Sequence, residues 1–515
     1  MTIQLTITYD STTIDLMADG YVVQDGYYPE TATDLNAQVS ESIDVYIRGS
    51  SQADLAGKIR AINRAFEQAR RHPTGPGGVY LNFALDKSLE LWRSRISDGT
   101  VDLDSGLTRR WKALGMKVGV IVERAPWWEG PEAQLALSNP LDTANTDGLP
   151  VYNPRLHRAS NTISFDSGTK KVLDSGNGLV DFQTGMTVTI EGSTGNDGTY
   201  TITDGGHAGY FVVSEAVSDE GAGANVGIDG PVCNYVEIAE GDVEGDLPAA
   251  TRLEITNNFN SENRAYTIWI GQNVESDPGN LSHILEAEDA SGETTVDSYL
   301  SSGNQYKDLD WSGAAENTLL TWTLSTELLN QLAGHYFRVI GKLFANVPAG
   351  LWVRLKVMMA ATVLWDGPLT LLQSGSAELQ ELASLRLPPY LLGSGDLYPL
   401  TMLLNAKINS AGAHTFHIDY IQLTPLDGWR KLQPKGYGAG YEVRVVDDGI
   451  DGYLYTDGWT PAGKTGHYVG YGNPIMVQPG KLQRIYFLHN NMYGTAKIYR
   501  TLSVKIYYRP RRLTI

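Results

Sequence analysis

The chain has 515 residues, too many for one hydrophobic core, and this length predicts about three or four domains. Its formal net charge of -19 argues against nucleic acid or a membrane surface as a general partner. A single cysteine, Cys233, excludes an intrachain disulfide framework and a zinc site built on thiolates. The 55 glycines and 28 tyrosines are typical of an all-β chain with many tight turns.

The first nine residues alternate as a strand does and have neither a basic nor an apolar leader region. We therefore expect no signal peptide, synthesis in a cytoplasm, and release by a route other than secretion. No run of residues approaches the length of a membrane span, so none is predicted.

The one convincing amphipathic helix of the chain follows a predicted strand at residues 42–48. Ser51 is placed to cap its first free amides, and Pro73 ends it. An apolar stripe at helical spacing predicts that the helix lies against a sheet. This stripe consists of Leu55, Ile59, Ile62 and Phe66.

The other face of this helix is rich in arginine, which is unusual in so acidic a chain. We interpret this face as a surface that meets acidic groups on a neighbouring copy. A solvated helix face is the alternative, and the sequence leaves it open. The arginines concerned are Arg60, Arg64, Arg70 and Arg71.

The first predicted domain, residues 1–130, is a β-sandwich with this helix as its only helical cover. Asp98-Gly99 predicts a hairpin turn after a strand at residues 91–96. At the end of the domain Pro126 interrupts a strand before Trp127 and Trp128, whose rings must point to opposite sides of an extended backbone. One ring is expected on the core edge and the other is free for a neighbour.

The remaining chain reads as strands and turns, so the predicted fold class is mainly β: multidomain β-sandwiches with one amphipathic helix and a jelly roll in the middle. Composition predicts four further segments. These are a linker at 131–150, a small β module at 151–230, a jelly-roll sandwich at 231–428 and a C-terminal β domain at 429–515.

Enzyme chemistry is not visible in the sequence, and we predict no catalytic residue, no cofactor and no metal. Glu286 and Glu288 are the best local pair of carboxylates, although two acids on one strand face are common on solvated surfaces. The acids of segment 447–451 could hold calcium, with a turn between strands as the preferred interpretation.

Aromatic residues are the better clue to binding, because a sugar-binding sandwich stacks pyranose rings on aromatic side chains. The tryptophans of the third unit fit alternating strands, where most tryptophans belong to the core. Trp311 and Trp365 are predicted to lie in turns instead, and they are our candidate glycan contacts.

Several segments resemble tail proteins of long-tailed bacteriophages. Residues 124–130, Arg-Ala-Pro-Trp-Trp-Glu-Gly, look like the end of the N-terminal domain of distal tail proteins, and the Pro479-Gly480 turn with residues 508–512 resembles their closing β domain. Residues 182–202 are similar to a small β module inserted in many phage tail proteins. Residues 285–289 and 416–423 look like the first and last strands of galactose-binding-like jelly rolls.

The resemblance implies a homo-oligomeric ring, most often of six copies, that joins the tail tube above to the hub and host-recognition parts below. In that family the N-terminal sandwich and its helix build the ring, so the four arginines, Trp127 and Trp128 become candidate ring contacts. The outer domains would face the host surface and are candidates to bind its polysaccharide. The expected location is the virion tail tip.

Three alternatives stay open at this point. One is a carbohydrate-binding adhesin with no ring role, which would lose glycan binding on Trp311→Ala or Trp365→Ala. Another is a polysaccharide-degrading enzyme, which would lose cleavage on Glu286→Gln. The third is a different tail part, such as a tube or hub subunit.

Overall fold

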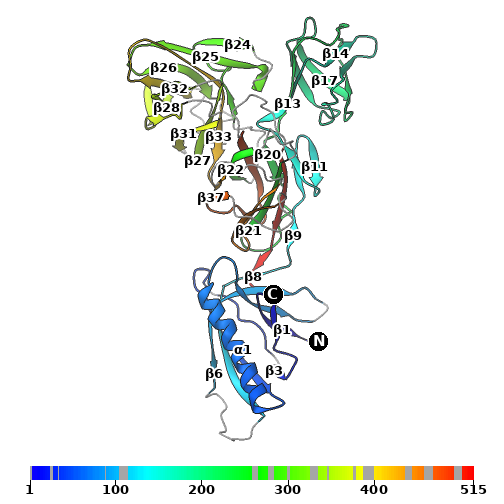
Figure 1. Cartoon of the computed structure of the whole chain (residues 1–515), viewed down its shortest axis with the longest axis vertical. Helices are drawn as coiled ribbons and strands as arrows, with labels where there is room; N and C mark the ends of the chain where they lie inside the picture. The colour runs from blue at the N-terminus through cyan, green and yellow to red at the C-terminus, as the bar shows by residue number, and fades with distance from the viewer. Residues whose placement is uncertain are drawn as a thin grey trace.

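The computed structural model describes residues 3–23, 27–32, 34–86, 89–103, 114–257, 265–275, 284–297, 302–324, 335–344, 347–374, 379–386, 400–434, 444–457, 468–491 and 502–515. These residues form four β-rich domains in an elongated molecule (Figure 1). An N-terminal domain occupies one end and a central sandwich the middle. A small module and a jelly-roll domain lie beside each other at the other end. The predicted class, mainly β with one amphipathic α-helix, is confirmed for the described part of the chain.

The N-terminal domain is a nine-stranded sheet with one helix, α1 (Gln52–Arg71), along one face (Figure 1). The helix begins after Ser51, whose hydroxyl accepts a hydrogen bond from the Asp54 amide at 3.1 Å. It ends at Arg71, two residues before Pro73. The strand order is β2-β1-β5-β6-β7-β4-β3, with β8 and β41 paired beside β6. The strands are β1 (Gln4–Tyr9), β2 (Thr12–Asp15), β3 (Tyr21–Val23), β4 (Val39–Arg48), β5 (Val79–Ala84), β6 (Trp92–Asp102), β7 (Gly115–Arg124), β8 (Trp128–Glu129) and β41 (Arg511–Arg512).

Helix and sheet meet through the predicted apolar stripe. Leu55, Ile62 and Phe66 are buried on the strands, and Ile59 packs against the same core. The predicted hairpin turn at Asp98-Gly99 is wrong, because β6 continues through it with a bulge between Ile96 and Asp98. Gly99 is needed there for a close approach: a Cβ on it would meet the Phe66 ring at 2.5 Å.

The central sandwich is built from three separate stretches of chain. Its two seven-stranded sheets have the orders β11-β10-β20-β39-β22-β34-β37 and β12-β40-β21-β35-β36, the latter with β9 and β38 at its margins. A shared apolar core lies between them. The strands are β9 (Ala133–Gln134), β10 (Leu137–Asn139), β11 (Asp142–Asn145), β12 (Leu149–Val151), β20 (Tyr235–Ile238), β21 (Ala249–Asn257), β22 (Ala265–Glu275), β34 (Gly428–Pro434), β35 (Arg444–Asp448), β36 (Tyr453–Asp457), β37 (Tyr468–Gly472), β38 (Met476–Val477), β39 (Leu482–Asn491) and β40 (Leu502–Tyr508).

Two of the predicted domain boundaries are corrected by these pairings. Residues 131–150 are not a linker, because Leu137 and Leu149 lie in the sandwich core and β12 pairs with β40. Residues 429–515 are not a separate C-terminal domain, because β39 pairs with β22 and β40 pairs with β21. Both sheets therefore need partners that lie hundreds of residues apart in the chain.

The small module is inserted between β12 and β20. Its seven-stranded sheet has the order β13-β19-β16-β17-β18-β15-β14 around a core that includes Phe182 and Phe211. The strands are β13 (Arg155–Ser160), β14 (Ile163–Asp166), β15 (Lys171–Asp174), β16 (Thr187–Glu191), β17 (Gly198–Asp204), β18 (Tyr210–Val213) and β19 (Val226–Val232).

The jelly-roll domain is inserted between β22 and β34, so it is shorter than the predicted segment 231–428. A six-stranded sheet, β24-β25-β33-β27-β31 with β23, faces a five-stranded sheet, β26-β32-β28-β29 with β30. Trp269 and Tyr420 contribute to a second, small core that joins this domain to the central sandwich. The elements are β23 (Ile284–Glu286), β24 (Thr294–Asp297), the short 3-10 turn η1 (Ser302–Asn304), β25 (Gln305–Ser312), β26 (Asn317–Leu324), β27 (Tyr336–Phe344), β28 (Leu351–Met359), β29 (Thr362–Asp366), β30 (Thr370–Leu371), β31 (Leu379–Arg386), β32 (Leu400–Ile408) and β33 (Ala413–Pro425).

The chain path is nested. It leaves the N-terminal domain at β8 and returns to it only at β41, which pairs with β8 through Arg511 opposite Glu129. Both ends of the chain accordingly lie in the N-terminal domain (Figure 1). The chain between β8 and β41 is thus covalently joined to the N-terminal domain through two adjacent strands.

Candidate functional site

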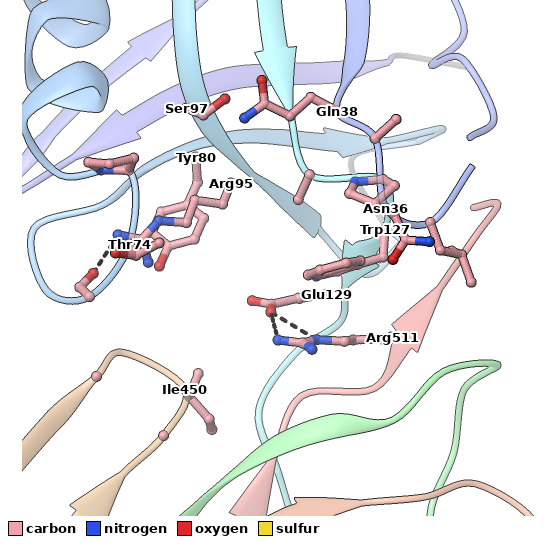
Figure 2. A pocket seen from close by; sticks show the side chains of 18 residues that line it. Asn36, Gln38, Thr74, Tyr80, Arg95, Ser97, Trp127, Glu129, Ile450 and Arg511 are labelled. Atoms are coloured by element: carbon pink, nitrogen blue, oxygen red, sulfur yellow. Dashed lines mark hydrogen bonds and ion pairs between the residues drawn. The ribbon is translucent and has the colours of Figure 1, made fainter. Parts of the chain in front are cut away.

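A pocket of 470 Å³ lies where the N-terminal domain meets the central sandwich (Figure 2). The strands β5 and β6 supply Tyr80, Arg95 and Ser97, all on the face of the sheet away from α1. The central sandwich supplies the 449–452 turn, and Arg511 of β41 closes one side. The other lining residues are Leu35, Asn36, Ala37, Gln38, Pro73, Thr74, Gly75, Ala125, Pro126, Trp127 and Glu129.

A network of charges ties the two domains together along this pocket. Arg511 donates to Glu129 from Nε at 3.2 Å and from Nη2 at 2.9 Å (Figure 2). Arg93 Nη2 lies 3.3 Å from the Glu129 carboxylate and 3.5 Å from that of Asp451, which belongs to the central sandwich. The Arg93 guanidinium also lies 4.1 Å over the Tyr80 ring, and burial raises the pKa of this phenol.

The pocket presents aromatic rings and guanidinium groups rather than catalytic chemistry. Arg95 donates to the carbonyls of His72 and Gly75, which holds the end of α1 against the sheet. The described lining contains no histidine or cysteine, and its one carboxylate, Glu129, is already paired with arginine. The arrangement therefore stabilises a junction between the two domains.

The four arginines predicted for a ring contact are all exposed on α1, but they are not equivalent. Arg70 is bonded within its own domain, at 2.6 Å from Asp98 and 3.0 Å from the Gly99 carbonyl. Arg60 donates to the Ala56 carbonyl one turn earlier, at 3.2 Å. Arg64 and Arg71 have no hydrogen bond or ion pair with any residue that the structure describes.

The two adjacent tryptophans point to opposite sides, as their sequence predicts. Trp128 is only 1% exposed, with its ring 6.3 Å from Phe83 and 4.5 Å below the Arg124 guanidinium. The prediction that Trp128 contacts a neighbouring subunit is therefore wrong, because its indole lies in the core of its own domain. Trp127 is half-buried beneath Arg511, at 4.7 Å, and lines the pocket (Figure 2).

The two candidate glycan contacts do not lie in turns. Trp311 is in β25, is 8% exposed and meets Phe416 edge to face in the jelly-roll core, so its prediction as a sugar contact is wrong. Trp365 lies in β29, half-buried and packed against the same core. Turn residues follow both tryptophans in the sequence, and for this reason both were predicted to lie in turns. Each is in fact the penultimate residue of a strand.

Glu286 proves to be a structural contact between two domains. Its carboxylate pairs with Arg155 of the small module and accepts the Ser302 hydroxyl at 2.8 Å. Burial raises its pKa, and burial together with repulsion from Glu286 raises the pKa of Glu288 to about 9. Asp419, fully buried nearby, has a pKa raised by burial and by Glu286.

These acids do not form a recognisable metal site. Among the residues that the structure describes, no three His, Cys, Asp or Glu side chains are placed to hold an ion together. The acids of segment 447–451 have other roles: Asp447 is paired with Arg430 at 2.7 Å, and Asp448 accepts the amides of the following turn. The interpretation of that segment as a turn is the one that fits.

Sequence reasoning missed one outward-facing aromatic side chain, the half-buried Trp352 on β28. The strand alternates with Leu351 and Val353 buried, so Trp352 lies on the outer face with Arg354 and Lys356. That alternation is visible in the sequence, where the residues at every second position of 352–356 are tryptophan, arginine and lysine. The sequence analysis assigned the tryptophans of alternating strands to the core, and Trp352 was included among them for that reason.

Comparisons with known proteins leave the chain without an assigned family. No protein-family model and no curated protein matches it. Solved structures similar to it include T=1 particles derived from infectious bursal virus, at 9% identity over 73% of this chain and 81% of that chain with a TM-score of 0.17. A VP2 subviral particle of infectious bursal disease virus matches at 9% identity over 70% and 82%, with a TM-score of 0.16. Similarities at this level carry no argument about fold or function.

The described residues also contain no helix that is both long and apolar enough to cross a membrane.

Proposed function

We propose that this chain is a structural, non-catalytic protein of a bacteriophage tail tip that assembles into a ring through its N-terminal domain. The tail tube would bind one side of the ring and the hub the other. The central sandwich, small module and jelly-roll domain would project outward toward the host. The ring has six copies in the family that the sequence resembles.

One observation carries the proposal: the helix-backed sheet stands at one end of the molecule and meets the rest at the β8 and β41 junction (Figure 1). One long side of α1 is exposed and carries Arg64 and Arg71 without partners among the described residues. A cationic face in a chain of net charge -19 can meet acidic groups on another copy. Close packing of N-terminal domains would leave the other three domains unobstructed.

A catalytic role has less support. Glu286, the best candidate acid in the sequence, is paired with Arg155 and buried between two domains. General acid–base catalysis needs a carboxyl that reaches a substrate proton. The pair uses that carboxyl to join the small module to the jelly-roll domain instead.

The proposal is tested by the size and shape of the purified full chain, measured by light scattering and negative-stain electron microscopy. We expect closed rings with peripheral lobes. The double variant Arg64→Glu and Arg71→Glu should shift the protein to monomers, because it replaces two cations with two acids on the contact face. Lys481→Glu, an exposed lysine in a turn of the central sandwich, is the matched control and should leave rings intact.

Monomers of the unchanged chain, or rings that persist in the double variant, would contradict the assignment of this face to assembly.

A further inference from the structure

We infer that the outer face of the five-stranded sheet of the jelly-roll domain binds an acidic polysaccharide, with Trp352 as the stacking surface and Lys407 as the contact for its anionic group. This inference rests on the proposed host-facing role of the outer domains. It does not depend on ring assembly.

The register of the sheet places the key side chains in one row. Trp352 on β28 lies opposite Leu371 on β30 at one side and Lys407 on β32 at the other. The residues that flank Trp352 on its own strand are buried in the jelly-roll core, so the three side chains of the row share the outer face. Leu371 is 53% exposed, which leaves an apolar margin beside the indole.

Trp352, like Trp365, has no partner for its ring or its N–H among the described residues, whereas other tryptophans do. Trp322 donates to the Glu286 carbonyl, Trp429 lies under Arg338, and Trp269 lies under Lys431. Trp352 is half-buried and has no ring contact, cation contact or hydrogen bond with a described residue. The part of the indole that reaches the surface therefore has no protein partner and can contact a ligand.

A polar network lies directly beside this row and is already ordered. The Glu316 carboxylate accepts the Asn405 amide at 2.8 Å and lies 3.6 Å from Lys356 Nζ. Arg354 is 3.7 Å from Glu316 and 3.4 Å from Asp366. Donors and acceptors held in place on a rigid sheet lose little entropy when they bind hydroxyl groups.

The charges of this face favour an anion. The face carries three cations, Arg354, Lys356 and Lys407, against two acids, Glu316 and Asp366, in a protein whose net charge is -19. The acids are paired with Arg354 and Lys356, whereas Lys407 has no ion-pair partner among the described residues. One cation without an ion-pair partner among the described residues therefore lies beside the half-buried indole.

These features specify the chemistry of the ligand. The apolar C–H face of a pyranose ring packs on the indole, its hydroxyls bond to the polar network, and the carboxylate of a uronic acid pairs with the Lys407 ammonium. A neutral polysaccharide would lack the last contact.

The test is affinity electrophoresis of the full chain in native gels that contain polygalacturonate, alginate or, as the neutral polymer, dextran. We expect retardation by at least one polyuronate and less by dextran. Trp352→Ala should weaken it roughly tenfold, and Trp352→Tyr should retain part of the binding. Lys407→Gln should weaken binding of polyuronate but not of dextran, and the effect should shrink in 0.5 M salt because salt screens exposed charges.

Tyr471→Ala, which removes an exposed aromatic side chain from the central sandwich, is the matched control and should bind as the parent does. Thermal unfolding of each variant separates lost binding from lost folding. The inference is overturned if neither polyuronate retards the parent, if Trp352→Ala binds as the parent does, or if dextran binds equally well.

The first of these outcomes removes the polysaccharide and leaves a protein partner as the alternative occupant of this face. Electron microscopy of Trp352→Ala keeps the two proposals distinct, since rings should form normally whether or not the polymer binds.

Discussion

Replacing Arg124 by methionine tests how the N-terminal domain holds its shape. Arg124 and Glu41 are 0% and 1% exposed, and Nε of the arginine donates to the carboxylate at 2.8 Å. Arg124 also donates to the Ala125 carbonyl at 2.8 Å. Methionine fills similar volume but leaves Glu41 as a buried charge with only the Tyr27 hydroxyl and the Glu30 amide as donors.

Breaking a buried ion pair by removing one partner costs about 3–5 kcal/mol. A domain of this size is stable by about 5–15 kcal/mol, and each kcal/mol corresponds to about 2–4 °C in melting temperature. The domain should therefore melt roughly 10 °C lower, as measured by calorimetry of the full chain. Glu41→Gln added to Arg124→Met should recover part of the loss, because it removes the unpaired charge.

Lys117→Met is the matched control in the same sheet. It breaks the Lys117–Asp44 pair, whose side chains are 46% and 39% exposed, and should cost less than about 1 kcal/mol. Equal shifts for Arg124→Met and Lys117→Met, or no recovery in the double variant, would show that burial of the pair does not determine its contribution.

Two further predictions concern the other junctions. The pKa of Glu288 is raised to about 9, so its contribution to stability should be fully present below pH 4.5 and should be lost as the pH rises toward 9. Glu288→Gln should flatten that fall in melts between pH 4 and 9, and parallel curves for variant and parent would contradict it. Arg511→Ala removes two hydrogen bonds to Glu129 and should destabilise the N-terminal domain by about 1–3 kcal/mol and speed protease cleavage between residues 129 and 133. Arg512→Ala, which removes an exposed cation 4.8 Å from the Trp92 ring, should have the smaller effect, and the reverse order would refute the role of the Glu129 network.

Local features of the N-terminal domain could be predicted because their causes lie close together in the sequence. Ser51 caps α1, its apolar stripe is buried on the sheet, and the helix ends before Pro73. The opposite orientation of Trp127 and Trp128 follows from the extended backbone alone. Each of these depends on interactions within a few residues or on strand alternation.

Strand partners could not be predicted in the same way. Periodicity shows that a segment is a strand, but it does not show which strand lies beside it. The short strands of residues 131–150 look like a linker because their partners, β20 and β40, come much later in the chain. The Arg155–Glu286 contact was missed for the same reason, since its two residues belong to different insertions.

The predictions of candidate glycan contacts failed where they depended on which face of a strand a tryptophan occupies. Trp311 looks exposed because Ser312 and Gly313 follow it, yet its ring lies inside the sandwich. Trp352 sits in a regular strand and yet faces outward. Turn residues after a strand indicate where the strand ends, whereas the parity of a position within the strand determines which face its side chain occupies.

The nested chain path has a mechanical consequence. A pull on the outer domains reaches the N-terminal domain through both covalent crossings, one after Glu129 and one before Arg511, and these strands are bonded to each other. Tension is thus divided between two anchored strands, and neither can be peeled away alone without shearing its neighbour. Outer domains attached through two paired strands should therefore need a larger force to separate from the N-terminal domain than domains attached through one strand.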